Sequence, residues 1–389
     1  MRAMHTSDWH LGRTFHGADL LAEQESVLGH LADLVVAEQV DVVLVSGDLY
    51  DRAVPSAETV RVAARVLAKI REAGAQLVIT AGNHDSAARL GAFSEFAAAG
   101  GLHLRTGIDQ IADPVLLDDP HGTVAVYGIP YLEPEPTRRA MDAPEAKGHA
   151  GVLTEAMRRI RADLATRERA RSLVLAHAFV TGGSGSDSER TIAVGGVEQV
   201  PGEAFDGVDY VALGHLHGPQ TLTDRLRYSG SPLAYSFSEA RHRKSVWLVE
   251  FDADGLGAVR KHELPVPRAL ATVSGRIDEL VSAPEYDDLV DRYLSVTLTD
   301  AVRPLDPMRR LRERFPHAVH LEWLPEGGDV RATLRYADAV RGRTDREIAH
   351  GFLSECRGAG PTAVEARLLD EALATASKAE VAEPGSVTR

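Results

Sequence analysis

Two kinds of hydrophobic pattern alternate through the first half of the sequence. Short apolar runs at Val42–Ser46, Gln76–Thr80 and Leu173–Ala176 have the length and composition of buried β-strands. Between them, Leu20–Ala37 and Ser56–Ala73 repeat apolar side chains at helical spacing. Because strands that alternate with helices form a largely parallel, covered sheet, the pattern predicts an α/β fold.

Shorter strands are predicted in the next part of the chain. Runs at Asp209–Leu213, Arg225–Ser229 and Val246–Phe251 favour a second sheet packed against the first. We therefore predict a two-sheet α/β sandwich over residues 1–264. The two prolines in Leu264–Pro267 can continue neither a strand ladder nor a helix, and they mark the end of this unit.

The remaining sequence predicts smaller units. Residues 265–340 combine a helix around Pro307–Phe315 with three strands, which indicates a small α+β capping domain; the strands are Leu294–Leu298, Val319–Trp323 and Asp329–Leu334. Residues 341–377 predict two short helices separated by Gly358–Pro361, and residues 378–389 a flexible tail. Because isolated helices of this length are marginally stable, we expect residues 341–377 to need a partner surface.

Composition and charge narrow the class of protein. A length of 389 residues, with 44% hydrophobic and 26% charged residues, indicates two or three folded units of an ordinary globular kind. The 43 basic and 57 acidic residues give a net charge of −14, which argues against a surface made for anionic membranes. Cys356 is the single cysteine, so an intramolecular disulfide and a Cys-rich zinc site are excluded. With no signal-peptide pattern or membrane-spanning run, a cytoplasmic location is expected.

The informative polar residues gather in five short motifs, each of which follows a strand-like run. The motifs are Asp8-Trp9-His10, Gly47-Asp48, Gly82-Asn83-His84-Asp85, His177 and Gly214-His215-Leu216-His217. Because the carboxyl ends of parallel strands converge in open α/β sheets, we expect these loops to form one site. Asp8 with His10, and His215 with His217, are two residues apart, so on extended backbone both members of a pair would point the same way.

These residue types predict a two-metal centre. The candidate ligands are two carboxylates, one amide and four imidazoles: Asp8, His10, Asp48, Asn83, His177, His215 and His217. One cation cannot bind seven ligands, but one carboxylate can bridge two cations about 3.5–4 Å apart. We predict that Asp48 is shared, that Asp8, His10 and His217 bind one cation, and that Asn83, His177 and His215 bind the other. Mixed nitrogen and oxygen ligands favour Mn²⁺, with iron and Zn²⁺ as alternatives.

Such a centre is suited to hydrolysing phosphate esters, because metal binding can lower the pKa of water from 15.7 to about 7. The leaving oxygen then needs an acid on the far side, and His84 is placed for this role beside Asn83. Asp51 is a candidate to orient the His84 ring. Asp85 is expected to be the N-cap of a helix that starts near Ser86. Each residue alone is more often structural, and only their combination favours a site.

The five motifs together resemble the calcineurin-like metallophosphoesterase family. Within it, four segments resemble bacterial nuclease subunits of the SbcD type: Met4–Gly17, Ser188-Glu189-Arg190, Gly214-His215-Leu216-His217 and Tyr228–Phe237. The resemblance implies the αββα sandwich of that family. It also implies the seven metal ligands above, a catalytic His84, and a double-strand exonuclease and single-strand or hairpin endonuclease acting in DNA recombination, replication and repair. The implied partners are DNA, an SbcC-type coiled-coil ATPase bound by the C-terminal helices, and a second copy in a homodimer within a heterotetramer.

Two other functions remain open at this point. The same ligands would serve a phosphatase or a cyclic-nucleotide phosphodiesterase, and Gly47–Arg52 also resembles the protein-phosphatase form of its motif. A binding scaffold without catalysis is the second alternative. The acidic net charge does not by itself suit a DNA enzyme, since DNA binding rests on Lys and Arg. Several basic residues near the motifs could offset it: Arg13, Arg52, Arg89, Arg190 and Arg241-His242-Arg243-Lys244.

Overall fold

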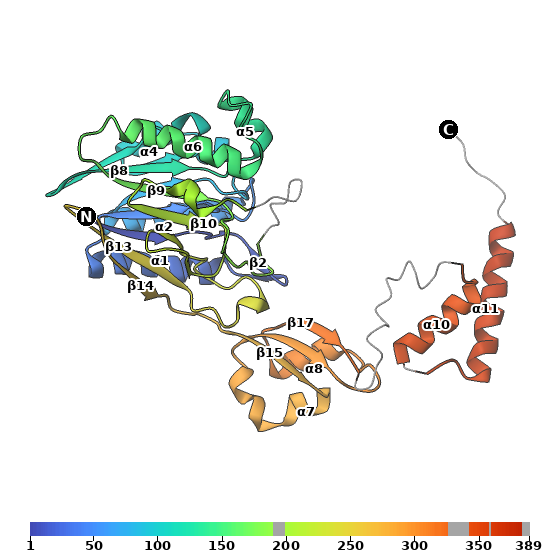
Figure 1. Cartoon of the computed structure of the whole chain (residues 1–389). Coiled ribbons are helices and arrows are strands. Elements are labelled where there is room, and N and C mark those ends of the chain that lie inside the picture. Colours follow the sequence, from blue (N-terminus) through green and yellow to red (C-terminus); the bar gives the residue numbers. More distant parts are fainter. Residues whose placement is uncertain (190–198, 326–341, 358, 383–389) are drawn as a thin grey trace. The chain divides into compact units, whose positions relative to one another are not determined.

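The computed structural model describes residues 1–189, 199–325, 342–357 and 359–382 (Figure 1). The chain divides into two compact units, Met1–Leu270 and Ala271–Arg389, and each is described by itself. The predicted strand at 329–334 and Arg190 lie outside the described residues. The predicted domain bounds at 264, 340 and 377 stay predictions.

One sheet of the first unit has six strands in the order β14-β13-β1-β4-β5-β6. Its four-stranded parallel half pairs β1 with β4, β4 with β5, and β5 with β6. On the other side of β1, β13 pairs antiparallel with β1, and the edge strand β14 pairs antiparallel with β13. The strands are β1 (Arg2–Thr6), β4 (Val42–Ser46), β5 (Gln76–Thr80), β6 (Leu102–Arg105), β13 (Ser245–Asp252) and β14 (Gly255–Glu263). The predicted strands at 42–46 and 76–80 are confirmed.

The second sheet also has six strands, in the order β11-β12-β10-β9-β8-β7. Its centre is parallel, from β12 through β10 and β9 to β8, and its two edge strands run antiparallel. The strands are β7 (Val115–Asp119), β8 (Gly122–Ile129), β9 (Arg171–His177), β10 (Tyr210–Gly214), β11 (Gln220–Thr221) and β12 (Leu226–Tyr228). The predicted second sheet is therefore present.

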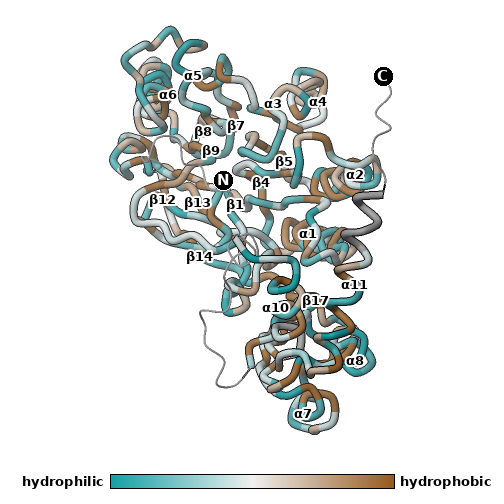
Figure 2. Tube along the Cα trace, turned by 90° about the vertical axis from the view of Figure 1, so that its right-hand side faces the viewer, coloured by the Kyte–Doolittle hydropathy of each residue, from teal (hydrophilic) through white to brown (hydrophobic). Residues whose placement is uncertain are grey.

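The two sheets pack face to face around an apolar core. Leu44 and Val78 of the first sheet belong to one buried cluster with Val126 and Leu175 of the second. Helices α1 (Leu21–Glu38) and α2 (Ala57–Glu72) connect β1 to β4 and β4 to β5, and each buries one face, so both carry hydrophobic and hydrophilic stretches in Figure 2. Helix α6 (Gly148–Leu164) packs Met157 and other apolar residues on the outer side of the second sheet. The predicted α/β sandwich is confirmed.

Short elements complete the first unit. They lie in the loops between the strands, where most of the polar site residues are found. They are β2 (Thr14–Phe15), β3 (Ala18–Asp19), α3 (Ala87–Leu90), α4 (Ser94–Ala99), α5 (Pro134–Ala140), and the 3-10 helices Ile108–Gln110, Gly202–Phe205 and Phe237–Glu239.

The second unit contains a three-stranded sheet in the order β15-β16-β17. Its elements are β15 (Leu270–Gly275), α7 (Ile277–Ser282), a 3-10 helix (Pro284–Leu289), β16 (Tyr293–Leu298), α8 (Pro307–Arg314) and β17 (Ala318–Trp323). Leu294 and Val296 of β16 share a fully buried cluster with Leu311 of α8 and Phe315. The predicted helix and the first two predicted strands of this α+β unit are confirmed, and β15 and α7 were not predicted.

Two further helices follow, α10 (Asp345–Arg357) and α11 (Ala363–Ala382). Each begins with a capping box, in which the hydroxyl of Thr344 or Thr362 accepts from a main-chain amide and the following Glu347 or Glu365 reaches back. Helix α11 has 20 residues, so the prediction of two short helices is wrong for the second. Within the described ranges, none of the helices has the length and apolar character needed to cross a membrane.

Candidate metal centre

The predicted ligands lie at the carboxyl ends of strands from both sheets. Asp8 and His10 follow β1, Asp48 follows β4, Asn83 and His84 follow β5, His177 ends β9, and His215 and His217 follow β10. Asn83 is half-buried and the others are buried. The common position at the strand ends explains how residues far apart in sequence meet at one place.

The backbone at these strand ends is not extended. Asp8, His10 and Asp48 have φ angles of 54°, 44° and 50°, and His215 has 106°, all in the region that side-chain-bearing residues rarely adopt. The expectation that extended backbone aligns Asp8 with His10 is therefore wrong, because tight left-handed turns orient these side chains instead. Backbone strain of this kind costs about 1–3 kcal/mol per residue and is typical of functional sites.

Two glycines are required by how closely the loops approach one another. A Cβ on Gly47 would lie 2.3 Å from Nδ1 of His177, and its φ of +86° is itself a glycine conformation. A Cβ on Gly214 would lie 1.8 Å from the carbonyl oxygen of Ser46. The glycines of the Gly47-Asp48 and Gly214-His215 motifs therefore allow the two sheets to bring their ligands together.

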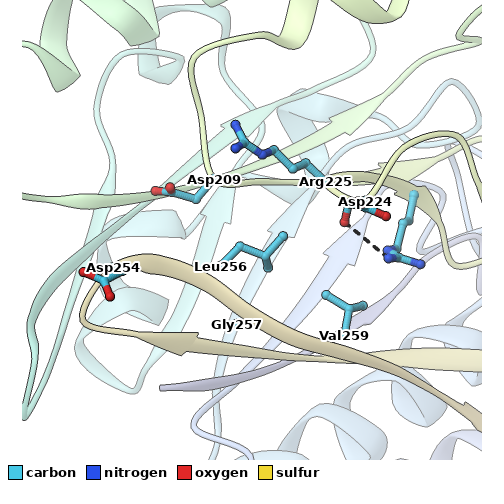
Figure 3. Close-up of a pocket in the computed structure, with 8 residues that line it drawn as sticks. Asp209, Asp224, Arg225, Asp254, Leu256, Gly257 and Val259 are labelled. Carbon is cyan, nitrogen blue, oxygen red and sulfur yellow. Dashed lines mark hydrogen bonds between the residues drawn. The ribbon is translucent and has the colours of Figure 1, made fainter.

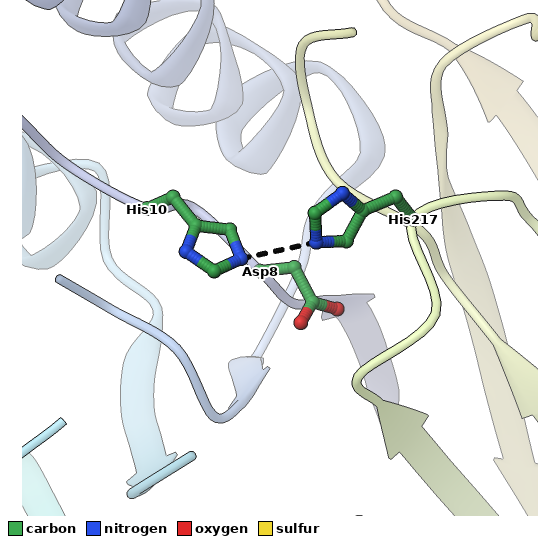
Figure 4. Close-up of side chains that lie close together, drawn as sticks. All are labelled: Asp8, His10 and His217. Atoms are coloured by element: carbon green, nitrogen blue, oxygen red, sulfur yellow. Dashed lines mark hydrogen bonds between the residues drawn. The ribbon is translucent and has the colours of Figure 1, made fainter. Parts of the chain in front are cut away.

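In the described part of the chain, three overlapping groups of side chains have ligand atoms within 4.8 Å of one another. The first contains Asp8, His10 and His217, and Figure 4 shows the two rings facing each other with the Asp8 carboxylate beside them. The Nε2 atoms of the two imidazoles are 3.0 Å apart. The other groups are His10, Asp48 and His84, and Asp8, Asp48 and His177.

The carboxylate of Asp48 lies between the two predicted ligand sets. Its Oδ2 is 3.5 Å from Nε2 of His10 and also 3.5 Å from Nε2 of His177. On the far side, Oδ1 of Asn83 is 2.9 Å from Nε2 of His177. The ring of His215 lies edge-on to His177, with 5.3 Å between centroids, and its main-chain amide donates to both carboxylate oxygens of Asp8 at 3.1 Å.

The electrostatics of these buried groups fit divalent cations. Burial lowers the pKa of His10, His177 and His215, so the rings stay neutral with a lone pair available for a metal. Burial raises the pKa of Asp8, although His177 and His217 oppose this shift. A carboxylate held away from water requires a compensating positive charge, which a bound cation supplies. The donors, four imidazoles with carboxylate and amide oxygens, suit a transition metal.

His84 is oriented by the main chain of Asp51 and not by its carboxylate. Nδ1 of His84 lies 2.9 Å from the carbonyl oxygen of Asp51, whereas the nearest carboxylate oxygen is 4.0 Å away. That carboxylate is 3.6 Å from Nδ1 of His10 and 3.6 Å from the guanidinium of Arg13. Because a carbonyl only accepts, Nδ1 of His84 carries a proton and Nε2 is the atom left for chemistry. The contact predicted for Asp51 is thus corrected, and its part in catalysis stays a prediction.

Asp85 does not cap a helix, contrary to the sequence prediction. Helix α3 begins at Ala87, and the Asp85 carboxylate instead accepts from the amides of Gly82, Leu49 and Tyr50 at 2.9–3.1 Å. Burial raises its pKa to about 6, against the opposing effect of these hydrogen bonds. Asp85 therefore ties the loop that carries Asp48 to the loop that carries Asn83 and His84.

Behind His217 lies a buried network that the sequence analysis missed. The hydroxyl of Ser188 is 2.5 Å from Nδ1 of His217 and donates a short hydrogen bond to Glu239. Lys244 donates to the other oxygen of Glu239 at 2.5 Å and to the carbonyl of His217 at 2.9 Å. Burial by itself would raise the pKa of Glu239, but the contacts with His217 and Lys244 hold this pKa well below its usual range. The segments 188–190 and 228–237 carried a family resemblance, but no spacing in the sequence links them to His217.

The neighbouring loop is fixed to the same ligand. One oxygen of Glu189 accepts from the amide of His217 at 2.8 Å, and the other accepts from the amide of Ser186 at 2.6 Å. Arg13 donates to the carbonyl of Ser188 at 2.8 Å. Arg13 and Lys244, which the sequence offered as DNA contacts, are therefore mainly internal, while Arg52, Arg89, Arg241 and Arg243 are exposed.

A polar pocket of about 470 Å³ lies apart from the metal centre (Figure 3). Asp209, Asp224 and Asp254 line it together with Arg225 and Arg227. Asp209 precedes β10 and His215 follows it, so the pocket and the metal centre are at opposite ends of this strand. The Asp209 carboxylate already accepts from the amide and hydroxyl of Ser172, at 2.7 and 2.9 Å.

Comparison with known families matches two parts of the chain. Residues 1–219 match the model for calcineurin-like phosphoesterases, and this range contains all seven predicted ligands and His84. Residues 266–356 match the model named SbcD_C, described as the type 5 capsule protein repressor C-terminal domain.

Several solved structures are similar at low sequence identity. The calcineurin-like phosphoesterase YfkN from Bacillus subtilis is 12% identical over 68% of this chain and 90% of its own, with a TM-score of 0.37. A dimetal phosphatase from Danio rerio is 12% identical over 68% and 96%, with a TM-score of 0.41. GAP50, the anchor in the inner membrane complex of Plasmodium, is 10% identical over 85% and 98%, with a TM-score of 0.37.

Proposed function

This chain belongs to the calcineurin-like phosphoesterase family, and from that premise we propose that it is the nuclease subunit of an SbcCD-type complex. Its substrate would be DNA, cleaved as a double-strand exonuclease and as a single-strand and hairpin endonuclease in recombination, replication and end processing. The catalytic part of this proposal rests on the position of Asp48, whose Oδ2 is 3.5 Å from Nε2 of His10 and 3.5 Å from Nε2 of His177. These two residues belong to the two different sets of proposed ligands. The match of residues 266–356 to the SbcD_C model supports the nuclease over a phosphatase.

We propose an assignment of residues to the two cations that the short distances among these side chains support. Asp8, His10 and His217 would bind one cation, Asn83, His177 and His215 the other, and Asp48 both. When bound, two divalent cations, Mn²⁺ by preference, would polarise the phosphoryl group and lower the pKa of the attacking water. The buried Glu239 and Ser188 would hold His217 in the tautomer that presents Nε2 to the metal.

The protein side chains would complete the reaction at the leaving oxygen. With its Nδ1 proton held by the Asp51 carbonyl, His84 can bind a second proton at Nε2 and donate it as the ester bond breaks. The neutral ring that remains keeps the same hydrogen bond, so His84 needs no reorientation between turnovers. Asp85, by joining the two loops, keeps His84 at a fixed distance from Asp48, whose Oδ1 accepts from the His84 amide at 2.8 Å.

We further propose that α10 and α11 bind the ATPase subunit. An ion pair between Arg346 and Asp370, at 2.8 Å, joins the two helices. Phe352 of α10 and Val364 and Leu368 of α11 are more than half exposed. Apolar residues presented on helices at this density are typical of a surface that packs into a partner's groove or coiled coil.

A homodimer is supported by an apolar groove beside α2. Leu49, Val60, Leu67 and Leu104 are among its lining residues, and its volume is about 400 Å³. Nearby, Phe93 and Phe96 are 78% and 85% exposed, which is costly for large apolar side chains in water. A second copy of the chain, as the resemblance implies, would cover these residues.

The experiment that tests this function is Mn²⁺-dependent cleavage of hairpin DNA, with and without the ATPase subunit. We expect that the chain cleaves hairpin DNA and that Asp48→Asn abolishes this cleavage. The ATPase subunit with ATP should stimulate it. A panel of phosphomonoesters and cyclic nucleotides serves as the comparison. Hydrolysis of those small esters without cleavage of DNA would replace the nuclease with the phosphatase alternative, and inactivity toward every substrate at full metal content would favour a scaffold.

A further inference from the structure

A second pocket is lined in part by Gly218, the residue that follows the proposed metal ligand His217 in sequence. It has a volume of about 460 Å³, and its lining includes Gly218, Arg241, His242, Arg243 and Lys261. Gly218 follows the ligand His217 in sequence, so the pocket wall starts about 3.8 Å along the backbone from a residue of the metal site. The ring of His242 packs over this glycine, since a Cβ there would lie 3.2 Å from its Cε1 atom.

The pocket is cationic in a chain whose net charge is −14. None of the described residues that line it is acidic. In the described part of the chain, Arg241 and Lys261 have no acidic side chain within ion-pair distance, and Arg243 has only the half-exposed Glu263 at 3.3 Å. Among the residues that the structure describes, no acidic side chain therefore neutralises Arg241 or Lys261, which leaves two cations available to a ligand.

Lys244 does not share this role, although it continues the same basic run. Its ammonium group is buried and bound to Glu239, Ser231 and the carbonyl of His217. The run 241–244 is thus divided, with Lys244 supporting the metal ligand from inside and Arg241 and Arg243 facing the pocket. Residues 241–244 therefore contact the metal ligand His217 through Lys244 and line the pocket through Arg241 and Arg243.

We propose that this pocket binds the phosphodiester backbone of the nucleic-acid strand that enters the metal centre, with Arg241 and Lys261 contacting phosphates that flank the scissile bond. The inference rests on the proposed nuclease function. A strand carries one phosphate per ~3.4 Å of duplex axis, so a strand with one phosphate at the metals has others within reach of a pocket that starts at the next residue. Arg and Lys are the side chains that position a nucleic-acid backbone without reading its sequence.

The test measures salt-dependent binding of a fluorescent single-stranded oligonucleotide to the full-length chain in a His84→Gln background, in which cleavage is slow. Each lost phosphate contact lowers the slope of log affinity against log salt by ~0.7 for single strands, so Arg241→Ala/Lys261→Ala should lower it by ~1.4. Between 50 and 200 mM salt, the affinity of the variant should therefore fall ~7-fold less than that of the parent. Bound Mn²⁺ per chain shows that the metal site is intact.

The matched control is Arg139→Ala/Arg158→Ala, which removes two exposed cations from α5 and α6 and should leave the slope unchanged. An unchanged slope in the Arg241/Lys261 variant, or an equal change in the control, would overturn the proposal. Loss of ATPase binding with an unchanged slope would show that the pocket binds protein instead. Failure of the unmodified chain to cleave DNA is a separate result and would count against the nuclease function.

Discussion

The hydroxyl of Ser188 lies 2.5 Å from Nδ1 of His217 and also donates to the buried carboxylate of Glu239. Nε2 of the same ring faces His10 at 3.0 Å, where a metal would bind. A ring that offers Nε2 to a metal must carry its proton on Nδ1. The order of donation is therefore His217 to Ser188 to Glu239, a carboxylate–histidine–metal arrangement with a hydroxyl in the middle.

Ser188→Ala should weaken Mn²⁺ binding about 10–100-fold, because the Nδ1 proton of His217 then loses the hydroxyl that accepts it at 2.5 Å. Isothermal titration calorimetry measures the dissociation constant. Ser188→Thr keeps the hydroxyl and should restore most of the affinity. Ser238→Ala, a change of the same size in the segment next to Glu239, should bind like the unmodified chain. Unaltered affinity in Ser188→Ala would remove Ser188 from the metal site.

Lys244→Met should lower the free energy of unfolding by about 3–5 kcal/mol, because the buried Glu239 loses its charge partner. Urea unfolding followed by circular dichroism measures the change. The double variant Glu239→Gln/Lys244→Met removes both charges and should recover a large part of the loss. If the double variant is as unstable as the sum of the single variants, the two side chains do not act as a pair.

His84→Gln should lower turnover about 10²–10⁴-fold at full metal occupancy, because it removes the proton donor and none of the seven ligands. Asp51→Asn should lower turnover much less, since the main-chain carbonyl that orients His84 is retained. Single-turnover cleavage with metal analysis compares the two variants, and His103→Gln is the matched control. A loss in Asp51→Asn equal to that in His84→Gln would show that the carboxylate acts in catalysis, as the sequence predicted.

Asp119 should contribute an acid-sensitive part of the stability of the sandwich. Arg171, which is buried, donates to both of its carboxylate oxygens at 2.6 and 2.9 Å and holds the pKa of Asp119 below its usual range. A carboxyl with a lowered folded-state pKa stabilises the protein above the unfolded pKa, about 3.9 for Asp, and this stabilisation is lost as the pH falls further. Asp119→Asn should have a lower free energy of unfolding than the unmodified chain at neutral pH, and this free energy should fall less on acidification. If the free energies of unfolding of the two proteins fell in parallel with pH, this prediction would be contradicted.

Phe352→Asp/Leu368→Asp should abolish capture of the chain by the ATPase subunit, because both side chains are exposed and apolar on the two C-terminal helices. Exposed substitutions cost little stability, so the nuclease activity of the chain alone should persist. A pull-down with the purified ATPase and a hairpin-cleavage assay give the two readings. Val302→Asp, also exposed and apolar but outside these helices, is the control. Normal capture of the double variant would place the ATPase contact elsewhere.

Much of the fold and most of the centre could be predicted from local patterns. The β4 and β5 strands are continuous apolar runs, and their loops carry Asp48 and Asn83 in short motifs. The prediction failed for backbone conformation, because the left-handed turns at Asp8 and His10 depend on contacts between the loops. Asp85 was misread as a helix cap for a similar reason, since its main-chain partners Leu49 and Tyr50 come from a different loop.

The supporting network was beyond sequence reasoning for a physical reason. Ser188, Glu239 and Lys244 are buried polar residues whose partners are distant in the chain, and burial of a polar side chain has no local signature. Strand β8 and helix α6 were also not identified, although they build the outer part of the second sheet. Long-range pairing, and not local propensity, decides where such residues and elements lie.

Anomalous diffraction from crystals saturated with Mn²⁺ locates each bound cation and so shows whether Asp48 holds two of them at once. We predict two peaks about 3.5–4 Å apart, both within bonding distance of the Asp48 carboxylate, one beside His10 and one beside His177. A single peak under saturating Mn²⁺, or two peaks of which only one contacts Asp48, would contradict the two-metal mechanism.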